Sequence, residues 1–350
     1  MSELFTAEEY HRILCPNPPD FLSEYGKLPL VKRLSGVGLL CGTDWTPLFK
    51  NSFFYSRLDH SLGVALIIWN FTHDRAQTLA GLFHDVSTRA FSHVTDFRNG
   101  DALTQESSED INARLVDEDK KLKELLVRDG LSSSAVDDYH MYPIADNPCP
   151  RLSADRLEYM YPSGAALSGE WSIEEVRKNY SHIKVLADES GCPELGFDSE
   201  EAALTYTKKF TAISLLLQHN EDKIAMQLMA DVVSRAVACK IICEDDLFLK
   251  SEEELISIFD GFAESRKDIV FTRLHKTFRN MTHVLHTDFP LPEHYCVSLE
   301  VKKRYINPLV MEAGEKSAVR ISDRSLEAKK LIEDFLAYRD TSYGCVPIVE

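Results

Sequence analysis

The sequence is short of positive charge. Its 350 residues include 39 lysines and arginines against 56 aspartates and glutamates, which gives a formal net charge of −17 with histidine neutral. Phosphate backbones recruit net-basic surfaces, so we expect no long nucleic acid as a partner. The same surplus of acid raises a question for any phosphate-bearing substrate, because the field of the whole protein repels such an anion.

Long apolar runs and targeting signals are also missing. The longest apolar run, Leu62 to Trp69, is far shorter than the roughly 20 residues that span a bilayer. The acidic start of the chain lacks the basic and apolar regions of a secretion signal. Eight cysteines are scattered without a CxxC pair, which is typical of reduced thiols. We therefore expect a cytoplasmic protein with no membrane partner.

Several common signatures of enzymes are absent as well. The sequence contains neither a Walker A motif nor a GxSxG motif. The glycines from Gly36 to Gly42 miss the dinucleotide-binding spacing by one residue and follow no predicted strand. These absences exclude the usual phosphate-binding loop, the nucleophile elbow and a dinucleotide site.

Apolar residues at helical spacing dominate what is present. They predict helices over 62–71, 75–84, 111–128, 151–160, 172–187, 200–218 and 221–242, and a capping box at Ser251 opens another. We expect Pro162 to end the fourth of these helices. Strands are predicted over 294–301, 305–310 and 317–321, before a final helix over 325–338.

These elements predict a mainly α fold, a helical body with a small C-terminal α+β region. We expect residues 1–165 to form the helical core that carries the chemistry. Residues 166–289 would continue the same helical body, and residues 290–350 would form the small α+β region.

Two histidines and two aspartates lie at the polar ends of apolar helical segments. His60 opens one segment, His84 and Asp85 end the next, and Asp155 sits in a third. Polar side chains in such apolar surroundings are costly to bury without a partner. Together they suit a divalent metal, and mixed nitrogen and oxygen ligands favour Mn, Fe, Zn, Ni or Co over Mg. Taken singly, each is more often a core histidine or a surface acid.

The sequence motifs around these residues resemble those of the HD-domain metal-dependent phosphohydrolases. It is most similar to their deoxynucleoside triphosphate triphosphohydrolase (dNTPase) branch, over residues 30–340. The motifs that carry the resemblance are Arg57-Leu-Asp-His60-Ser-Leu-Gly-Val64, Ala80-Gly-Leu-Phe-His84-Asp85, Phe91-Ser-His93-x-x-Asp96 and Asp155-x-x-x-Tyr159.

The resemblance implies an HD-domain helical bundle with His60, His84, Asp85 and Asp155 as metal ligands. It also implies a nucleotide or related phosphate ester as substrate. Relatives in that branch assemble into oligomers, so a homo-oligomer is an expectation of the resemblance alone. A second His-Asp pair, His73-Asp74, lacks the Ala-Gly-Leu-Phe lead-in and stands at a helix start, where an acid suits the helix dipole.

The chain departs from that branch at two histidine positions. Ser87 and Thr88 stand where the branch has Gly-His, and Gln105 stands nearest to a second histidine. Neither Thr nor Gln can act as a general acid near pH 7. Three functions therefore stay open: a metal-dependent phosphohydrolase, a regulatory protein that binds a nucleotide or metal with little turnover, and a scaffold with a vestigial site.

Further residues are candidates for handling the substrate. Arg57 could neutralise a phosphate, since guanidinium matches phosphate oxygens in a fork, or be an ordinary residue at a helix entry. His93 could contact the phosphate with Asp96 orienting it, or the two could be a polar pair at a helix start. Arg89, Arg156 and Tyr159 complete the predicted substrate-binding set, although both arginines could simply be solvated.

A basic stretch is the remaining feature of note. It consists of Arg266, Lys267, Arg273, His275, Lys276, Arg279, His283 and His286. It could recognise phosphates or hold an oligomer contact, but we favour a solvated helix face.

Overall fold

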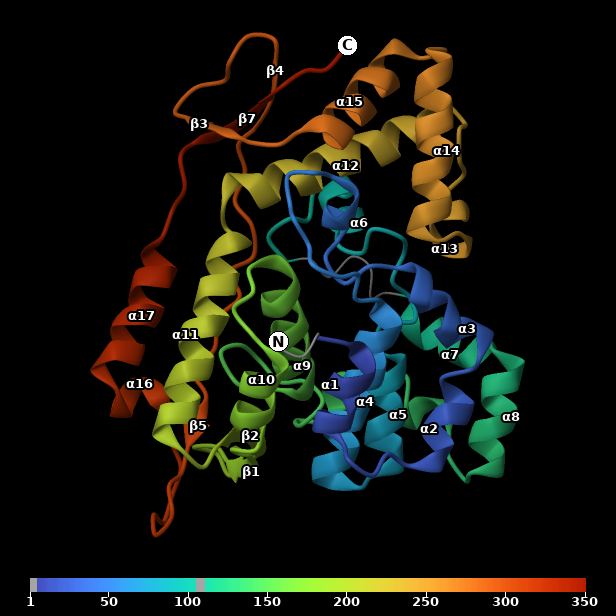
Figure 1. The fold of residues 1–350 in the computed structure, drawn as a ribbon. Coiled ribbons are helices and arrows are strands. Elements are labelled where there is room, and N and C mark those ends of the chain that lie inside the picture. Colours follow the sequence, from blue (N-terminus) through green and yellow to red (C-terminus); the bar gives the residue numbers. More distant parts are fainter. Residues whose placement is uncertain (1–4, 105–110) are drawn as a thin grey trace.

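The computed structural model describes residues 5–104 and 111–350. Gln105 lies outside these residues. In the described part the chain is mainly α-helical, with seventeen α-helices and seven short strands (Figure 1). This confirms the predicted mainly α class.

The helices of the first half have these bounds: α1 (Ala7–Leu14), α2 (Asp20–Tyr25), α3 (Pro29–Lys32), α4 (Arg57–Thr72), α5 (Arg75–Phe83), α6 (Val94–Arg98), α7 (Asn112–Glu118), α8 (Lys120–Arg128), α9 (Ala154–Leu167) and α10 (Ile173–Tyr180). Those of the second half are α11 (Glu200–Leu216), α12 (Asn220–Ala238), α13 (Asp246–Leu249), α14 (Glu252–Ser265), α15 (Ile269–Asn280), α16 (Ile321–Arg324) and α17 (Leu326–Ala337).

The strands form two small sheets. The first has the order β1-β2-β5-β6, with β1 (Ile183–Ala187), β2 (Pro193–Phe197), β5 (Leu309–Val310) and β6 (Val319–Arg320). The second has the order β3-β7-β4, with β3 (Leu285–Thr287), β4 (His294–Val297) and β7 (Tyr343–Pro347). Strands from the C-terminal 61 residues thus pair with strands from two earlier parts of the chain. The boundaries 1–165, 166–289 and 290–350 stay a prediction.

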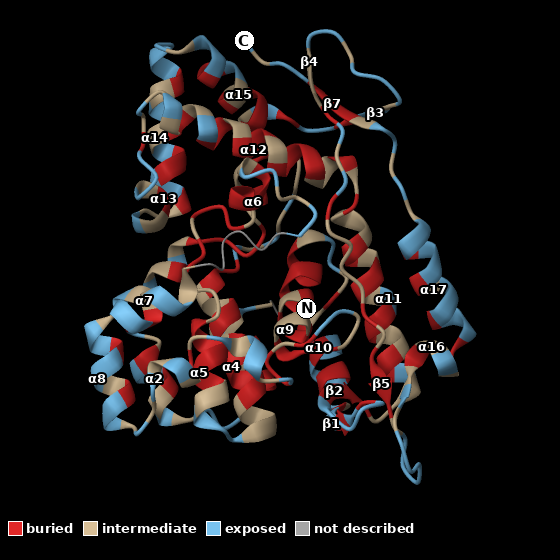
Figure 2. Cartoon of the chain, turned by 180° about the vertical axis from the view of Figure 1, so that it is seen from behind, coloured by how far each residue is buried: buried red, intermediate tan, exposed pale blue. Residues whose placement is uncertain are grey.

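Buried apolar side chains gather into two clusters, seen as the red faces of the helices in Figure 2. The first joins α1, α4, α5, α9, α10 and α11, and the second joins α6, α12, α14 and α15. The turn after α5 leads from one cluster to the other, because Val86 belongs to the first and Phe91 to the second. The His-Asp motif therefore lies where the two clusters meet.

Pro162 does not end α9, contrary to the prediction. A proline inside a helix lacks the N–H that would bond to the carbonyl four residues earlier, which here is that of Glu158. The hydroxyl of Tyr10 on α1 donates to this carbonyl over 2.9 Å and takes the place of the missing bond. A tertiary contact thus lets the helix continue to Leu167.

Other predicted boundaries were also wrong. The helix predicted over 172–187 ends at Tyr180, and a β-hairpin follows, closed by Asp188, whose carboxylate accepts the N–H groups of Ser190 and Cys192. The helix predicted over 111–128 is broken at Asp119, which caps α8. The three C-terminal strands are shorter than predicted.

Most of the predicted helices are confirmed, including α4, α5, α11, α12, the capping box at Ser251 and the final helix α17. All eight cysteines are unpaired, as expected for thiols. Among the described residues, no helix combines the length and apolar character needed to cross a membrane.

Candidate metal centre

Helix ends deliver the four predicted ligands to one place. A capping box of Ser56 and Asp59 starts α4, which puts His60 in its first turn. His84 is the C-cap of α5 and Asp85 follows it. Ser153 caps α9, so Asp155 also lies in a first turn. The helices α5 and α9 both pack against α4, which brings these three ends together.

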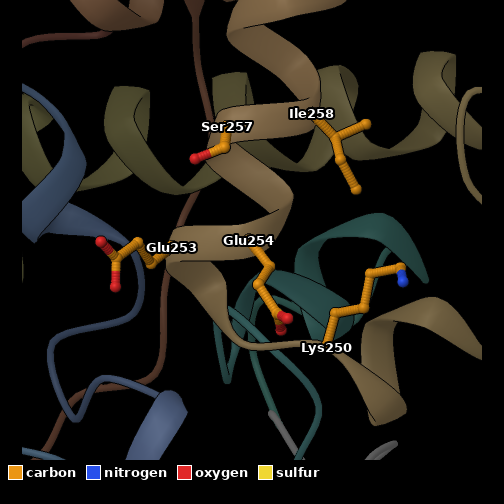
Figure 3. Close-up of a pocket in the computed structure, with 5 residues that line it drawn as sticks. All are labelled: Lys250, Glu253, Glu254, Ser257 and Ile258. Carbon is orange, nitrogen blue, oxygen red and sulfur yellow. The ribbon is translucent and has the colours of Figure 1, made fainter.

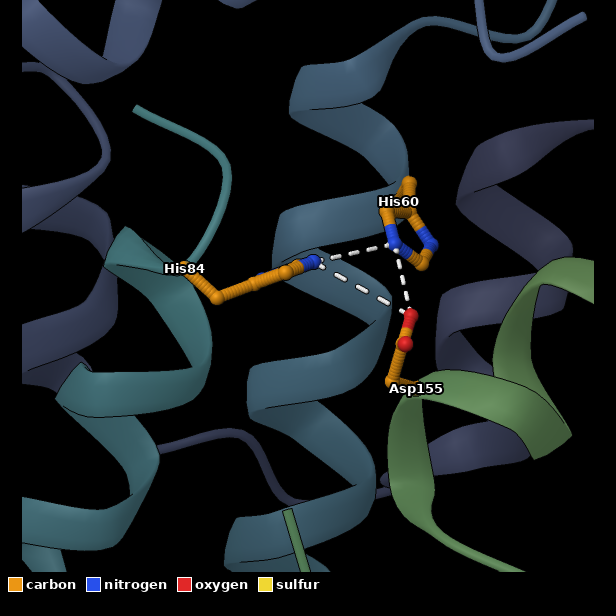
Figure 4. A group of neighbouring side chains, drawn as sticks. All are labelled: His60, His84 and Asp155. Atoms are coloured by element: carbon orange, nitrogen blue, oxygen red, sulfur yellow. Dashed lines mark hydrogen bonds and ion pairs between the residues drawn. The ribbon is translucent and has the colours of Figure 1, made fainter. Parts of the chain in front are cut away.

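The ligand atoms converge closely (Figure 4). His60 Nε2 lies 3.2 Å from His84 Nε2 and 3.1 Å from Asp155 Oδ1, while His84 Nε2 lies 3.9 Å from that oxygen. Asp85 Oδ2 lies 3.5 Å from His84 Nε2 and 3.9 Å from His60 Nε2. His60, His84 and Asp155 thus converge on one point, and Asp85 lies beside the two histidines.

The hydrogen bonds of the two rings test whether a cation fits there. His84 Nδ1 donates to the carbonyl of Gly81 over 2.7 Å, and His60 Nδ1 donates to the carboxylate of Glu158. The Nε2 atoms of the two rings therefore face each other, and in the neutral rings that bind metals each of them carries a lone pair. These lone pairs repel unless a positive charge lies between them, so a divalent cation fits this donor set.

The electrostatics of the site also call for positive charge. Burial opposes a charge on His60, but the carboxylates of Glu158 and Asp155 outweigh it and raise its pKa to about 10. A metal ion would therefore bind at Nε2 in place of a proton. Burial would raise the pKa of Asp85, yet Arg57 and the two histidines lower it strongly. Anionic oxygens and imidazole nitrogens therefore share a buried space, which suits a bound metal ion.

Asp85 is fixed by two further side chains. Arg57 Nη1 donates to its Oδ2 over 2.8 Å, and Arg57 Nε donates to Ser92 Oγ over 3.0 Å. Thr88 Oγ1 donates to the other oxygen, Oδ1, over 3.0 Å. Thr88 thus helps to orient the carboxylate of Asp85.

His93 and Asp96 are also brought together, as the sequence suggested. His93 Nδ1 donates to Asp96 Oδ2 over 2.9 Å, and Asp96 is fully buried. Burial lowers the pKa of His93, with Arg304 and Arg57 adding to the effect, while Asp96 opposes it. The ring is therefore neutral near pH 7 and carries a lone pair on Nε2.

The other predicted substrate-binding residues differ in availability. Arg156 is held by the carbonyl of Arg151 and by Asp146 and Asn147, through all three guanidinium nitrogens. Arg89 is half-buried, and its charge acts on Glu244. Tyr159 lies on α9 one turn after Asp155, and burial raises its pKa to about 12.

Glu158 and Tyr139 were missed by the sequence reasoning. Glu158 is fully buried and accepts hydrogen bonds from His60 and from the Tyr55 hydroxyl, at 2.6 Å for the latter. Its position three residues after Asp155 was an available signal, since both then share a helix face. The ring of Tyr139 lies 4.9 Å from that of His84, and nothing in its sequence surroundings pointed to it.

His73 and Asp74, the second His-Asp pair, serve only to cap helices. His73 has a left-handed backbone and ends α4, and Asp74 accepts the N–H of Gln77 at the start of α5.

Two pockets stand out among the described residues. One adjoins the ligands and is lined by Arg57, His84, Asp85, Ser87, Thr88, Ser92, His93 and Tyr139. The other is an open hollow beside α14, lined by Lys250, Glu253, Glu254, Ser257 and Ile258 (Figure 3). Glu254 serves there in the capping box of α14. The convergent polar groups make the first pocket the candidate site.

Comparison with known proteins gives relatives in sequence and in fold. The chain is 23% identical over 294 residues to the metal-dependent phosphohydrolase cns2 of Cordyceps militaris, which covers 83% of this chain and 81% of that one. It is 24% identical over 277 residues to the uncharacterized protein YdhJ of Bacillus subtilis, covering 77% and 79%. No family model matches the sequence.

Solved structures share the fold over nearly the whole chain. A phosphohydrolase from Bacteroides thetaiotaomicron superposes with a TM-score of 0.64 at 14% identity, covering 95% of this chain and 96% of that one. A hypothetical protein from Aquifex aeolicus superposes with a TM-score of 0.60 at 15% identity, covering 95% and 93%. The chain is therefore similar to one metal-dependent phosphohydrolase in sequence and to another phosphohydrolase in fold.

Proposed function

We propose that this protein is a metal-dependent phosphohydrolase of the HD type that acts on a nucleotide or a related phosphate ester. The observation that carries the proposal is the convergence of His60, His84 and Asp155 with Asp85 beside them, the two imidazole Nε2 atoms facing each other. The similarity to a phosphohydrolase described as metal-dependent supports the same reaction class. The dNTPase branch is the nearest resemblance in motifs.

The four ligands would hold a divalent transition metal. When bound, such an ion would polarise a phosphoryl oxygen and lower the pKa of a water molecule, which would supply a nucleophile for phosphorus. Arg57 keeps Asp85 ionised and oriented, and Glu158 orients His60 by accepting a hydrogen bond from its Nδ1. His93, neutral and held by Asp96, presents Nε2 to accept a proton in the pocket.

Turnover by a panel of substrates tests the proposal. The Mn²⁺-loaded protein is incubated with deoxynucleoside triphosphates and nucleoside monophosphates, and released triphosphate, pyrophosphate and orthophosphate are separated. We expect one of these products, and a loss of at least 100-fold in Asp155→Ala. Asp198→Ala, which removes a carboxylate on the hairpin of β1 and β2, is the matched control. Equal rates in Asp155→Ala and wild type contradict the proposal.

One observation favours a second function, a nucleotide-binding regulatory protein. Thr88 stands at the position that carries histidine in the dNTPase branch, and its hydroxyl donates a hydrogen bond to Asp85. This position therefore offers no titratable group to the substrate. This function predicts measurable nucleotide binding by the metal-loaded protein with no product under any metal. A homo-oligomer and a cytoplasmic location remain part of the proposal.

A further inference from the structure

We infer that Arg304, from the segment between β4 and β5, is a substrate-binding residue of the metal centre and contacts a phosphate oxygen of the substrate. The inference rests on the proposed phosphohydrolase function and adds a specificity-determining residue to it. It is based on the contact between Arg304 and His93, two residues that are far apart in the sequence.

The Arg304 guanidinium reaches the substrate side of His93. Its Nη2 lies 3.4 Å from His93 Nε2, the ring nitrogen that is not used by Asp96. His93 lines the pocket beside His84 and Asp85. The charges of Arg304 and Asp155 both act on the hydroxyl of Tyr159. Arg304 therefore lies near the candidate site at His93 and at Tyr159.

The backbone on both sides of Arg304 is held in place. Gln218 at the end of α11 donates to the carbonyl of Lys302 over 3.0 Å, and the Lys302 N–H donates to Ala102 over 3.1 Å. After Arg304, the carbonyl of Tyr305 accepts from the Cys149 thiol over 3.2 Å, and the N–H of Asn307 donates to the carbonyl of Pro150 over 2.8 Å. In Figure 1 this segment runs along α11. Such anchoring fixes where the guanidinium can reach.

The donors of Arg304 are also less engaged than those of Arg57 and Arg156. Arg57 is bound by Asp85 and Ser92, and Arg156 by two side chains and a carbonyl. Arg304 has no ion pair with a described residue, and its contact with His93 is long. Because a guanidinium forms its strong bonds with anionic oxygens, a phosphate would displace this weak contact.

One acidic group faces Arg304 from α12. Asp222 is largely buried, and burial raises its pKa to about 7 while the charges of Arg304 and Lys223 oppose the rise. It lies beyond ion-pair distance, so it leaves the donors of Arg304 open to a ligand.

Phosphate binding by the Mn²⁺-loaded protein tests the inference, with inorganic phosphate as the probe in isothermal titration calorimetry. We expect Arg304→Gln to weaken binding about tenfold or more, because one charge-assisted hydrogen bond is lost. The phosphate affinity of Arg304→Lys should lie between those of wild type and Arg304→Gln, since lysine keeps the charge but lacks the two-pronged geometry of the guanidinium. Arg339→Gln is the matched control, an exposed arginine of the same C-terminal region.

The outcomes separate this inference from the proposed function. Unchanged phosphate affinity in Arg304→Gln, or no phosphate binding by wild type, overturns the inference. If phosphate binding depends on Arg304 but the protein hydrolyses no ester, the inference is supported and the proposed phosphohydrolase function is contradicted. In steady-state assays on a substrate that is turned over, we expect Arg304→Gln to raise KM more than it lowers kcat. Thermal unfolding of each variant shows whether it is folded. If Arg304→Gln does not fold, the phosphate affinity of Arg304→Lys provides the test instead.

Discussion

Glu158 fixes the tautomer and orientation in which His60 could bind a metal ion. A histidine that ligates through Nε2 needs an acceptor on Nδ1 to fix its tautomer and ring orientation. Glu158 supplies that acceptor from a fully buried position, and the Tyr55 hydroxyl donates to its other oxygen. Gly63 leaves the room for this carboxylate, because a Cβ there would lie 2.3 Å from Glu158 Oε1.

We therefore expect Glu158→Gln to lower metal affinity by about 10- to 100-fold. The amide keeps the shape of the side chain but removes the charge that stabilises the ligating imidazole. Mn²⁺ affinity from competition with a chromophoric chelator measures the effect. Tyr55→Phe is the control, since it leaves the charge in place and should cost less. A folded Glu158→Gln variant with wild-type affinity would show that Glu158 has no such role.

Glu252 is a second buried acid, and its role depends on pH. Its carboxylate accepts the N–H groups of Gly38 and Phe91 and the indole N–H of Trp45. It thereby holds the backbone next to Ser92, the partner of Arg57. Burial raises its pKa to about 7, although these hydrogen bonds oppose the rise.

The raised pKa predicts a stability change with a definite sign. The folded state keeps the Glu252 proton up to about pH 7, whereas the unfolded state releases it near 4.5. The free energy of unfolding therefore falls as pH rises across this window. Above it the loss persists, but Glu252 adds no further pH dependence. We expect wild type to lose up to about 3 kcal/mol relative to Glu252→Gln between these pH values. Urea unfolding at several pH values measures this, and a constant difference would contradict it.

At the scale of elements, the site was easier to predict than the elements around it. Motif spacing put His60, His84 and Asp155 at helix ends, and the structure brings them together because α4, α5 and α9 pack side by side. The continuation of α9 past Pro162 could not be predicted, because the hydroxyl that replaces the missing bond comes from Tyr10 on α1. Likewise Arg304 meets His93 only through tertiary packing.

The C-terminal strands are tied to the hairpin of β1 and β2 by a buried ion pair. Arg320 on β6 donates to Glu194 on β2 over 2.7 Å, and the Glu194 carboxylate is almost fully buried and also accepts the N–H of Leu152. The same arginine binds Glu189, which is mostly exposed. One pair is therefore shielded from water and the other is not.

We expect Arg320→Ala to lower the free energy of unfolding by about 3–5 kcal/mol, because it leaves a buried carboxylate without its partner. Glu189→Ala should cost at most about 1 kcal/mol, as exposed ion pairs do. Urea unfolding of the two variants compares them directly. Equal losses of unfolding free energy in the two variants would mean that the burial of Glu194 does not determine the destabilisation.

At the scale of the whole molecule, the surplus of acid is not offset by a free basic face. Four of the eight residues in the basic stretch from Arg266 to His286 pair with acids. Arg273 binds Glu350, Arg279 and His275 bind Asp260, and His286 lies between Glu221 and Asp340. The attraction for a phosphate must then be local, from a metal ion and nearby arginines, within a Debye length of about 8 Å at physiological salt.

This charge distribution predicts no binding of duplex DNA. Fluorescence anisotropy of a labelled duplex, titrated with the protein at low salt, should show no change, because a net charge of −17 opposes the phosphate backbone. A salt-dependent increase in anisotropy would contradict this view of the surface.

The central claim is that one buried metal site carries the activity. Metal content and phosphate release are measured together on the same samples: as purified, after removal of metal by a chelator, and after addition of Mn²⁺. We expect release to be lost and regained in step with the metal in wild type, and Asp155→Ala to retain neither. Full phosphate release from metal-free protein would contradict the account.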